Sequence, residues 1–249
     1  MRPQAHTQWK SDPSFARLVL GRRVFVLHRE ILPHAAAIAA ALREIGSSRS
    51  ADGAGNRGSG RRLSLEGGLL LFARQAKRGG LARFLLTDMF VGISPRPLGE
   101  LAVAAEANRR GVPVAEPMGA MVQWLAPGIY RGFFLSRVVA GMTLWEFLRT
   151  DDDPIVKKHV LMTARAAIVT MHDKGLFHAD LNLHNLMVTQ SGESFKVVIL
   201  DFDKARIYDS SLRPALRAAN ARRLLRSARK LDPASQYLDE SALSILDVS

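Results

Sequence analysis

Apolar residues in the first half of the chain are grouped into short runs that are separated by glycine and proline. Residues 33–46 and 99–111 have apolar positions at helical spacing, and the second segment ends in a glycine, which is a common helix stop. The mostly apolar run at 69–75 has the length of a buried strand, and the run at 132–141 predicts another strand followed by a turn. This half of the chain therefore predicts a strand-rich lobe.

The second half is dominated by helical periodicity. Residues 153–175 have the most regular amphipathic pattern of the chain. A polar segment, HADLNLHNLMV at 178–188, precedes FKVVILDFD at 195–203, a β-branched strand pattern that ends in carboxylates. We expect two lobes, a sheet-rich lobe at 1–136 and a helical lobe at 137–249.

The composition is that of a folded protein without disulfides. The 249 residues are 47% hydrophobic and 23% charged, which suits one domain or two lobes that share a cleft. The chain has no cysteine, which excludes thiolate metal sites and thiol catalysis. The N-terminal stretch MRPQAHTQWKSDPSF lacks the apolar core of a signal peptide, and no apolar run approaches the ~20 residues of a membrane span. We therefore expect a cytoplasmic protein without a transmembrane segment.

The net charge of +12 at pH 7 narrows the set of partners. A strongly basic protein attracts polyanions, such as nucleic acid, an anionic membrane surface or a phosphorylated substrate, although a solvated basic surface explains the charge as well. The tract 212–231 holds seven Lys or Arg and no acid, with its leucines on one side of a helix and Arg222, Arg226 and Arg229 opposite. This tract predicts a packed helix with a cationic outer face.

The segment 178–188 concentrates groups that carry chemistry. A zinc site would use His178, Asp180 and His184, but their spacing matches no established zinc pattern such as His-Glu-x-x-His. A polar turn, in which Asp and Asn cap the local backbone, is a second interpretation. The third is phosphoryl transfer, which needs an Asp to orient the attacking hydroxyl, and an Asn and another Asp to hold magnesium on the phosphates.

Asp180, Asn185 and Asp201 follow one another in the order and spacing that phosphoryl transfer requires. Asn185 comes five residues after Asp180, and Asp201 ends the next strand pattern sixteen residues later. H-x-D-L-x-x-x-N followed by D-F-D resembles the catalytic core of the protein-kinase-like fold. The resemblance implies an α+β fold, in which an N-terminal antiparallel sheet lobe with one helix precedes a helical C-terminal lobe. It also implies ATP and Mg²⁺ as cofactors, with Asp180 as the catalytic residue and Asn185 and Asp201 as metal ligands.

Glycines and a basic residue upstream fit the phosphate-binding part of this fold. The string GAGNRGSG at 53–60 supplies Gly55 and Gly58 for a turn whose backbone amides approach phosphates, and Arg74 follows Gly58 by sixteen residues. An arginine in place of the usual lysine still offers a positive charge, in a fork geometry. Lys77 is the alternative phosphate-facing cation, and a loop without fixed order is the alternative interpretation of the glycine-rich string.

Two departures separate the chain from regulated protein kinases. Ala179 replaces the arginine that reads an activation-loop phosphate, and the 48 residues after Asp201 contain no A-P-E string. A small-molecule kinase fits better. The strings RQAKRGGLARFLLTDMF, RGVPVAEPMGA, HADLNLHNLMV, ILDFDKAR and ANARRLLRSARKL resemble the lipopolysaccharide kinase family, and within it the members that phosphorylate 3-deoxy-D-manno-octulosonic acid (Kdo). The resemblance runs from about Gly55 to Leu231.

The family resemblance implies ATP-dependent phosphorylation of a Kdo hydroxyl on a lipid A precursor, by a peripheral protein at the cytoplasmic face of the inner membrane. Asp180 would orient the hydroxyl and take up its proton late. Arg74 would bind the ATP phosphates, steadied by Glu100, with Glu106 as the second choice. The basic residues of 212–231 would attract an anionic membrane surface, each contributing about 1 kcal/mol.

Several alternatives stay open at this point. A lipopolysaccharide heptose kinase or an aminoglycoside-type phosphotransferase would carry the same catalytic set. A non-catalytic basic protein on a degenerate kinase fold would bind membrane or RNA, although the complete set of Asp180, Asn185 and Asp201 argues against degeneracy. We expect no nucleic-acid partner, because the tract 212–231 contains no Phe, Tyr or Trp to stack on bases.

Overall fold

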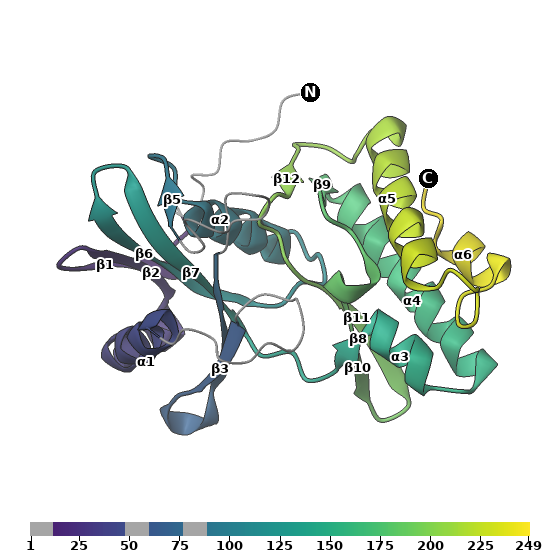
Figure 1. Ribbon diagram of the computed structural model, residues 1–249, viewed down its shortest axis with the longest axis horizontal. Helices are drawn as coiled ribbons and strands as arrows, with labels where there is room; N and C mark the ends of the chain where they lie inside the picture. Colours follow the sequence, from purple (N-terminus) through teal and green to yellow (C-terminus); the bar gives the residue numbers. More distant parts are fainter. Residues whose placement is uncertain (1–11, 48–59, 77–88) are drawn as a thin grey trace. The chain divides into compact units, whose positions relative to one another are not determined.

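The computed structural model of the chain describes residues 12–47, 60–76 and 89–249, which divide into two compact units (Figure 1). The sheet unit contains the described residues up to 105 together with Glu116–Val138. The described part of the helical unit contains Glu106–Ala115 and Val139–Ser249. These units are discontinuous in sequence, whereas the lobes expected from the sequence meet at a single boundary after residue 136. That boundary stays a prediction.

The sheet unit is built on a seven-stranded sheet, as far as the chain is described. The strand order is β1-β2-β6-β7-β4-β3, and β5 pairs with β7. The strands are β1 (Phe15–Leu20), β2 (Arg23–His28), β3 (Gly60–Ser64), β4 (Leu70–Gln75), β5 (Phe90–Val91), β6 (Pro117–Ala126) and β7 (Ile129–Arg137). All neighbouring strands run antiparallel, which confirms the sheet predicted for the N-terminal lobe.

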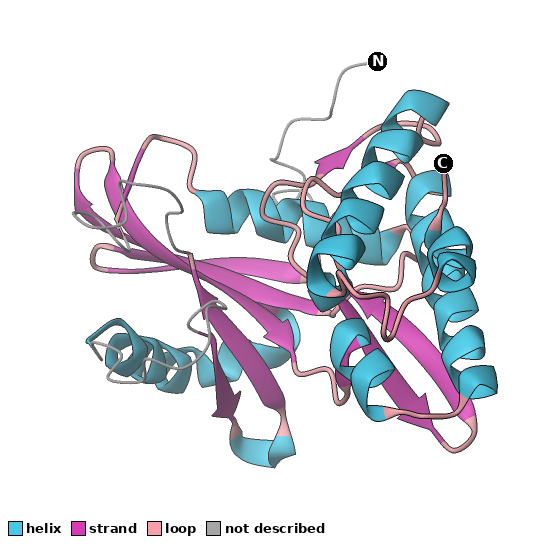
Figure 2. Cartoon of the chain, turned by 45° about the vertical axis from the view of Figure 1, so that its right-hand side comes forward, coloured by secondary structure: helices cyan, strands magenta, loops and turns pink. Residues whose placement is uncertain are grey.

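Two helices cover opposite faces of this sheet (Figure 2). They are α1 (Ala35–Ser47) and α2 (Arg96–Arg109), which match the helical patterns of the sequence, whereas the fold resemblance implied one helix in this lobe. Leu27 of β2 belongs to the buried cluster that includes the apolar side of α1, whereas its neighbour Val26 packs with Leu101 of α2. Successive strand residues point to opposite faces, so the alternation along β2 sets the side on which each helix lies. Short 3-10 helices occur at Arg29–His34 and Glu66–Gly68.

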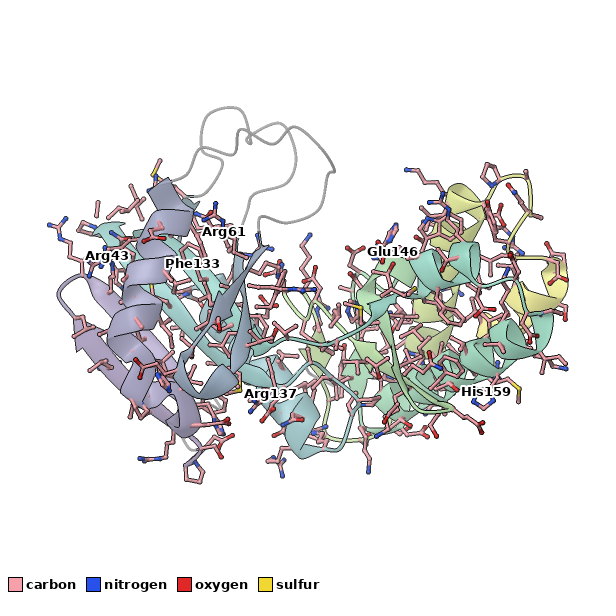
Figure 3. All side chains as sticks on the ribbon, turned by 90° about the horizontal axis from the view of Figure 1, so that it is seen from below. Arg43, Arg61, Phe133, Arg137, Glu146 and His159 are labelled. Carbon is pink, nitrogen blue, oxygen red and sulfur yellow. The ribbon has the colours of Figure 1, made fainter. Side chains whose placement is uncertain are left out.

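Four α-helices lie in the described part of the helical unit besides the end of α2. They are α3 (Leu144–Thr150), α4 (Pro154–Asp173), α5 (Pro214–Leu231) and α6 (Glu240–Leu246). Thr143 and Glu146 form a capping box that begins α3 (Figure 3), and the carboxylate of Asp153 accepts two backbone N–H bonds at the start of α4. Pro214 lies in the first turn of α5, a position that proline favours because its missing N–H would have no partner there. Among the described residues, none of the helices combines the length and the apolarity that a bilayer span requires.

Short strands complete the helical unit, and two predicted strands end earlier than the apolar pattern indicated. The strands are β8 (Met142–Thr143), β9 (Leu176–Phe177), β10 (Leu186–Ser191), β11 (Ser194–Ile199) and β12 (Arg206–Ile207). The strand expected to reach residue 141 stops at Arg137, and the strand expected to reach residue 203 stops at Ile199. The second correction has a clear cause, because Asp201 has a φ of 65°, which no strand accommodates.

Gly175 follows α4 at the helix stop predicted from the sequence. Its φ is 78°, and a Cβ there would lie 2.5 Å from the carbonyl oxygen of Tyr208 and 2.6 Å from that of Ser210. Gly175→Ala is expected to lower the free energy of unfolding by about 2–4 kcal/mol in urea denaturation, because left-handed strain and a clash add together. Gly21→Ala is the matched control, with a φ of 58° and no atom within 4 Å of the new Cβ. Equal losses in the two variants would contradict the clash.

Candidate active site

His178 braces the start of the polar loop that the sequence singled out. Its Nδ1 accepts a hydrogen bond from the backbone N–H of Asp180 at 3.2 Å, so its proton is on Nε2, which donates to the carbonyl oxygen of Leu200 at 2.9 Å. Burial lowers the pKa of His178 below its ordinary value of 6.5 and keeps the ring neutral, although the bond to Leu200 acts in the opposite direction. With both ring nitrogens bonded to backbone, His178 holds the loop and serves neither as a general base nor as a metal ligand.

Asp180 presents its carboxylate to solvent while its backbone is fixed. The carbonyl oxygen of Asp180 accepts hydrogen bonds from the side-chain amides of Asn182 at 2.8 Å and Asn185 at 2.9 Å. The Asp180 side chain is 62% exposed, and its Oδ1 lies 3.4 Å from Nη1 of Arg223 on α5. The backbone of Asp180 is therefore fixed, and its carboxylate stays accessible from solvent.

Asn185 and Asp201, the predicted metal ligands, come from adjacent stretches of backbone. The carbonyl oxygen of Asn185 accepts a hydrogen bond at 2.9 Å from the N–H of Leu200, the residue before Asp201. The side-chain amide nitrogen of Asn185 donates to the carbonyl oxygen of Asp180, whereas the side-chain oxygen of Asn185 takes no part in that bond. Magnesium in nucleotide sites takes one or two protein oxygen ligands and completes its shell with phosphate and water. A carboxylate and an amide oxygen at this place fit Mg²⁺ carried by ATP.

Asn220 of α5 anchors the loop from the interior. Its amide nitrogen donates to the carbonyl oxygen of His178 at 2.6 Å, and its Oδ1 accepts from the His178 backbone N–H at 3.2 Å. The same Oδ1 lies 3.1 Å from Nε2 of His172 on α4. Asn220 and His172 are completely buried. These bonds tie α4 and α5 to the residue that stands two positions before Asp180.

In the sheet unit, Arg74 of β4 forms an ion pair with Glu100 of α2, the first choice from the sequence. Glu100 is 5% exposed, so a buried carboxylate orients the guanidinium group of Arg74. Glu106 instead lies 2.6 Å from both Arg109 and Arg110 within the helical unit. Burial alone would raise the pKa of Glu106, but hydrogen bonds from the two arginines outweigh it and lower that pKa. Glu106 is therefore committed to the end of α2 and not to Arg74.

Of the glycine-rich string at 53–60, the structure describes Gly60 alone. Three residues expected near the nucleotide lie outside the described residues, and their roles stay predictions: Gly55, Gly58 and Lys77. The last glycine of the string, Gly60, pairs with Arg74 in the ladder between β3 and β4. A Cβ on Gly60 would lie 2.1 Å from the ring of Phe72, so a side chain at this position requires that ring to move.

The sequence of the chain matches a known family over the stretch that carries these residues. Residues 58–242 match the sequence model described as Lipopolysaccharide kinase (Kdo/WaaP) family. The chain belongs to this family. The match includes Arg74, Glu100 and the whole loop from His178 to Asp201, so the family resemblance inferred from short strings is confirmed.

Relatives within the family carry the name 3-deoxy-D-manno-octulosonic acid kinase. The chain is 31% identical to the one from Actinobacillus succinogenes over 135 residues, which cover 53% of this chain and 55% of the relative. It is 31% identical to the relative from Xylella fastidiosa strain M23 over 163 residues, which cover 64% of this chain and 61% of the relative. The chain is 30% identical to the relative from Haemophilus influenzae over 136 residues, which cover 53% of this chain and 55% of the relative. The chain thus spans less than two thirds of the length of these relatives.

A solved structure of WaaP, a name that also appears in the description of the family, has a similar fold. WaaP in complex with acyl carrier protein gives a TM-score of 0.52 at 15% identity, with 75% of this chain and 71% of that chain covered. At this identity the likeness concerns the fold alone. It confirms the expected α+β, protein-kinase-like fold class.

Asn220 and Arg223 of α5 contact the loop, but the sequence pattern did not identify them as site residues. The tract 212–231 was interpreted as a cationic outer face, which draws attention away from its buried side. Asn220 stands four residues after Leu216 and four before Leu224, and therefore lies on the leucine side of the helix. A polar residue on an apolar helix face signals a buried hydrogen bond, and that signal was available.

His172 makes the stability of this family member depend on pH. Burial lowers its pKa from 6.5 to about 4, although the hydrogen bond to Asn220 acts in the opposite direction. Below pH 6.5 the unfolded chain binds a proton that the folded chain excludes, so stability is present above pH 6.5 and is lost as the pH falls towards 4. We expect His172 to account for a loss of about 2 kcal/mol between pH 7 and pH 5. The neutral ring of His178 adds to this loss.

The measurement is urea unfolding of His172→Gln at both pH values, because glutamine keeps a donor for Asn220 but does not titrate. The variant is expected to lose less stability on acidification than the wild type. His159→Gln, an exposed site on the same helix (Figure 3), is expected to retain the wild-type pH dependence. A pH dependence that is equally steep in His172→Gln would contradict the assignment.

Proposed function

We propose that the protein transfers the γ-phosphoryl group of ATP to a hydroxyl group of Kdo on a lipid A precursor. The observation that carries the proposal is the loop of the helical unit, where the exposed Asp180 is fixed by Asn185 and lies near the end of β11 that leads to Asp201. The family match supports the reaction class, and the relatives named Kdo kinase support the acceptor.

Each residue has a defined task in this reaction. Asp180 accepts a hydrogen bond from the acceptor hydroxyl and orients its oxygen toward the γ-phosphorus. As that oxygen bonds to phosphorus and the bond to the ADP oxygen breaks, the hydroxyl proton passes to Asp180. Asn185 and Asp201 hold Mg²⁺, which neutralises charge on the phosphates when bound. Arg74, oriented by Glu100, binds the ATP phosphates.

The proposed location is the cytoplasmic face of the inner membrane, with α5 as the attachment surface. Arg217, Arg223 and Arg229 of α5 have ion-pair partners. Four further cations at the start of α5 and along it are exposed and have no ion pair with any described residue: Arg213, Arg222, Arg226 and Lys230. A cationic helix face attracts an anionic leaflet, which is also where a lipid A precursor would be anchored.

The double variant Arg222→Glu/Arg226→Glu is expected to bind anionic phospholipid vesicles at least about 30-fold more weakly, because each basic residue contributes about 1 kcal/mol near the surface. Co-sedimentation at physiological salt measures this binding. Arg43→Glu/Arg61→Glu is the control, since it changes the net charge equally at two exposed arginines of the sheet unit (Figure 3). Equal weakening in both double variants would assign the binding to net charge and not to α5.

The proposed acceptor is tested by supplying ATP, magnesium and one candidate acceptor at a time. We expect phosphate transfer to a Kdo-bearing lipid A precursor and none to a heptosylated core or an aminoglycoside. Transfer to either of the latter in place of the Kdo acceptor would contradict the acceptor and favour the corresponding alternative kinase. Vesicle binding without transfer to any acceptor would favour a non-catalytic membrane-binding protein.

A further inference from the structure

One arginine of α5 lies beside the Asp180 carboxylate and has no part in the phosphoryl transfer itself. Nη1 of Arg223 is 3.4 Å from Oδ1 of Asp180, and the two side chains are 52% and 62% exposed. Within the described part of the chain, Arg223 is the cation that forms an ion pair with this carboxylate. The segment 178–188 itself contains no Lys or Arg. The positive charge next to the catalytic group is therefore supplied from a different element.

The position of Arg223 is fixed relative to the loop. Asn220, about one helical turn earlier, is bonded to the backbone N–H and carbonyl oxygen of His178. Leu224, the next residue in the chain, is completely buried. The helix is thus anchored on both sides of Arg223, so the backbone from which this side chain projects is fixed relative to the loop independently of the exposed ion pair.

The acceptor must come close to this guanidinium group. A hydroxyl that transfers its proton to Asp180 has to approach the carboxylate to about 2.6–3.2 Å. Since Arg223 Nη1 lies 3.4 Å from Oδ1, a hydroxyl bound to Oδ1 is at most about 7 Å from that nitrogen, and a hydroxyl bound to Oδ2 at most about 9 Å. A sugar ring spans that distance, so a substituent on the ring that bears the hydroxyl reaches Arg223.

We propose that Arg223 binds the carboxylate of the acceptor sugar and thereby selects a sugar acid as substrate; this inference rests on the proposed function. Kdo carries a carboxylate on its sugar ring, and the planar fork of an arginine matches a carboxylate with two parallel hydrogen bonds. The exposed ion pair with Asp180 contributes little stability, so Arg223 exchanges it for the acceptor at small cost. Arg223 is a substrate-binding residue in this scheme, and Asp180 is left to the hydroxyl.

Steady-state kinetics with two acceptors test the proposal. The acceptors are the Kdo-bearing lipid A precursor and the same molecule with the Kdo carboxylate converted to a neutral amide. Arg223→Ala is expected to raise the KM for the intact acceptor about 10- to 100-fold, the range of a charge-assisted hydrogen bond, and to leave the KM for ATP unchanged. Arg223→Lys, which keeps the charge but loses the fork, is expected to fall between the wild type and Arg223→Ala.

The two changes form a cycle that isolates the contact. The neutral amide is expected to raise the KM of the wild type by a similar factor and to cause no further increase in Arg223→Ala. Arg43→Ala is the control for net charge, since Arg43 is an exposed arginine of α1 (Figure 3) and its loss is expected to leave both KM values unchanged. The melting temperature of Arg223→Ala is expected to equal that of the wild type, because the pair is exposed.

Three results would overturn the inference. If Arg223→Ala raises the KM for ATP and lowers kcat equally with both acceptors, Arg223 serves the nucleotide and not the acceptor. If its acceptor KM equals that of the wild type, the contact has no role in binding. If the wild type transfers no phosphate to the Kdo acceptor, the proposed function fails and the inference fails with it, whereas the first two results leave the proposed function intact.

Discussion

Asp180→Ala is expected to lower the rate of phosphate transfer to the Kdo acceptor by about 10²- to 10⁴-fold, the range for loss of a positioned general base. The carboxylate orients the attacking hydroxyl and receives its proton, and alanine does neither. Initial rates at saturating ATP and acceptor measure the effect. The variant is expected to bind ATP as the wild type does, because no step of nucleotide binding uses Asp180.

Folding does not explain such a loss, since the Asp180 side chain is 62% exposed and the bonds that fix the loop involve its backbone. The thermal unfolding curve of Asp180→Ala is therefore expected to match that of the wild type. Asp152→Ala, at an exposed carboxylate between α3 and α4, is the control and is expected to retain full activity. A rate for Asp180→Ala equal to that of Asp152→Ala would remove Asp180 from the mechanism.

Asp201→Asn is expected to lower the rate by about 10²- to 10³-fold at ordinary magnesium concentrations, because the metal contributes several kcal/mol to charge stabilisation. Asparagine is the informative substitution here. Asp201 has a φ of 65°, and asparagine is one of the few residues that adopt this conformation readily, whereas alanine would add backbone strain. The loss in Asp201→Asn therefore reports the missing charge and not a distorted loop.

The measurement for Asp201→Asn is a magnesium titration of the rate. The variant is expected to need a higher magnesium concentration for half-maximal activity, and to recover part of its rate at high magnesium. Asn185→Ala is expected to shift the titration in the same direction by a smaller factor, since it removes a neutral ligand. A wild-type magnesium dependence in Asp201→Asn would show that Asp201 is not a metal ligand.

The sequence predicts the order of the elements well, because helical and strand periodicity are local properties. The helices found as α2, α4 and α5 coincide with amphipathic segments, and Gly175 ends the pattern of α4 as expected. The end of β11 was placed too late, because apolar residues continue past Ile199 to Leu200 and Phe202. The hydrophobic pattern does not indicate that Asp201 has a positive φ, and this backbone conformation ends the strand.

The hairpin of β1 and β2 also lay outside the sequence-based prediction. Residues 15–28 alternate poorly, and the burial of Val26 on one face and Leu27 on the other is decided by α2 and α1, which are distant in sequence. Periodicity within one segment does not encode which helix will cover it. Tertiary packing supplied this information.

The candidate site was predicted in part. Asp180, Asn185 and Asp201 follow a short motif, and the choice of Glu100 for Arg74 followed from the fold resemblance; the ion pair supports that choice. The contact of Arg223 with Asp180 joins residues 43 positions apart. Helical periodicity placed Arg222 and Arg226 on an outer face, but it does not show which arginine of a basic tract faces the loop. That contact depends on the anchoring of α5 by Asn220.

The central claim is that this chain phosphorylates a Kdo-bearing lipid through Asp180. Mass spectrometry of the acceptor after incubation with protein, ATP and magnesium tests it most directly. We expect a mass gain of one phosphate on the Kdo-bearing lipid A precursor with the wild type and, after the same short incubation, at most about one hundredth of that product with Asp180→Ala. An unchanged acceptor with a wild-type protein that binds ATP, or an equal gain with Asp180→Ala, would contradict it.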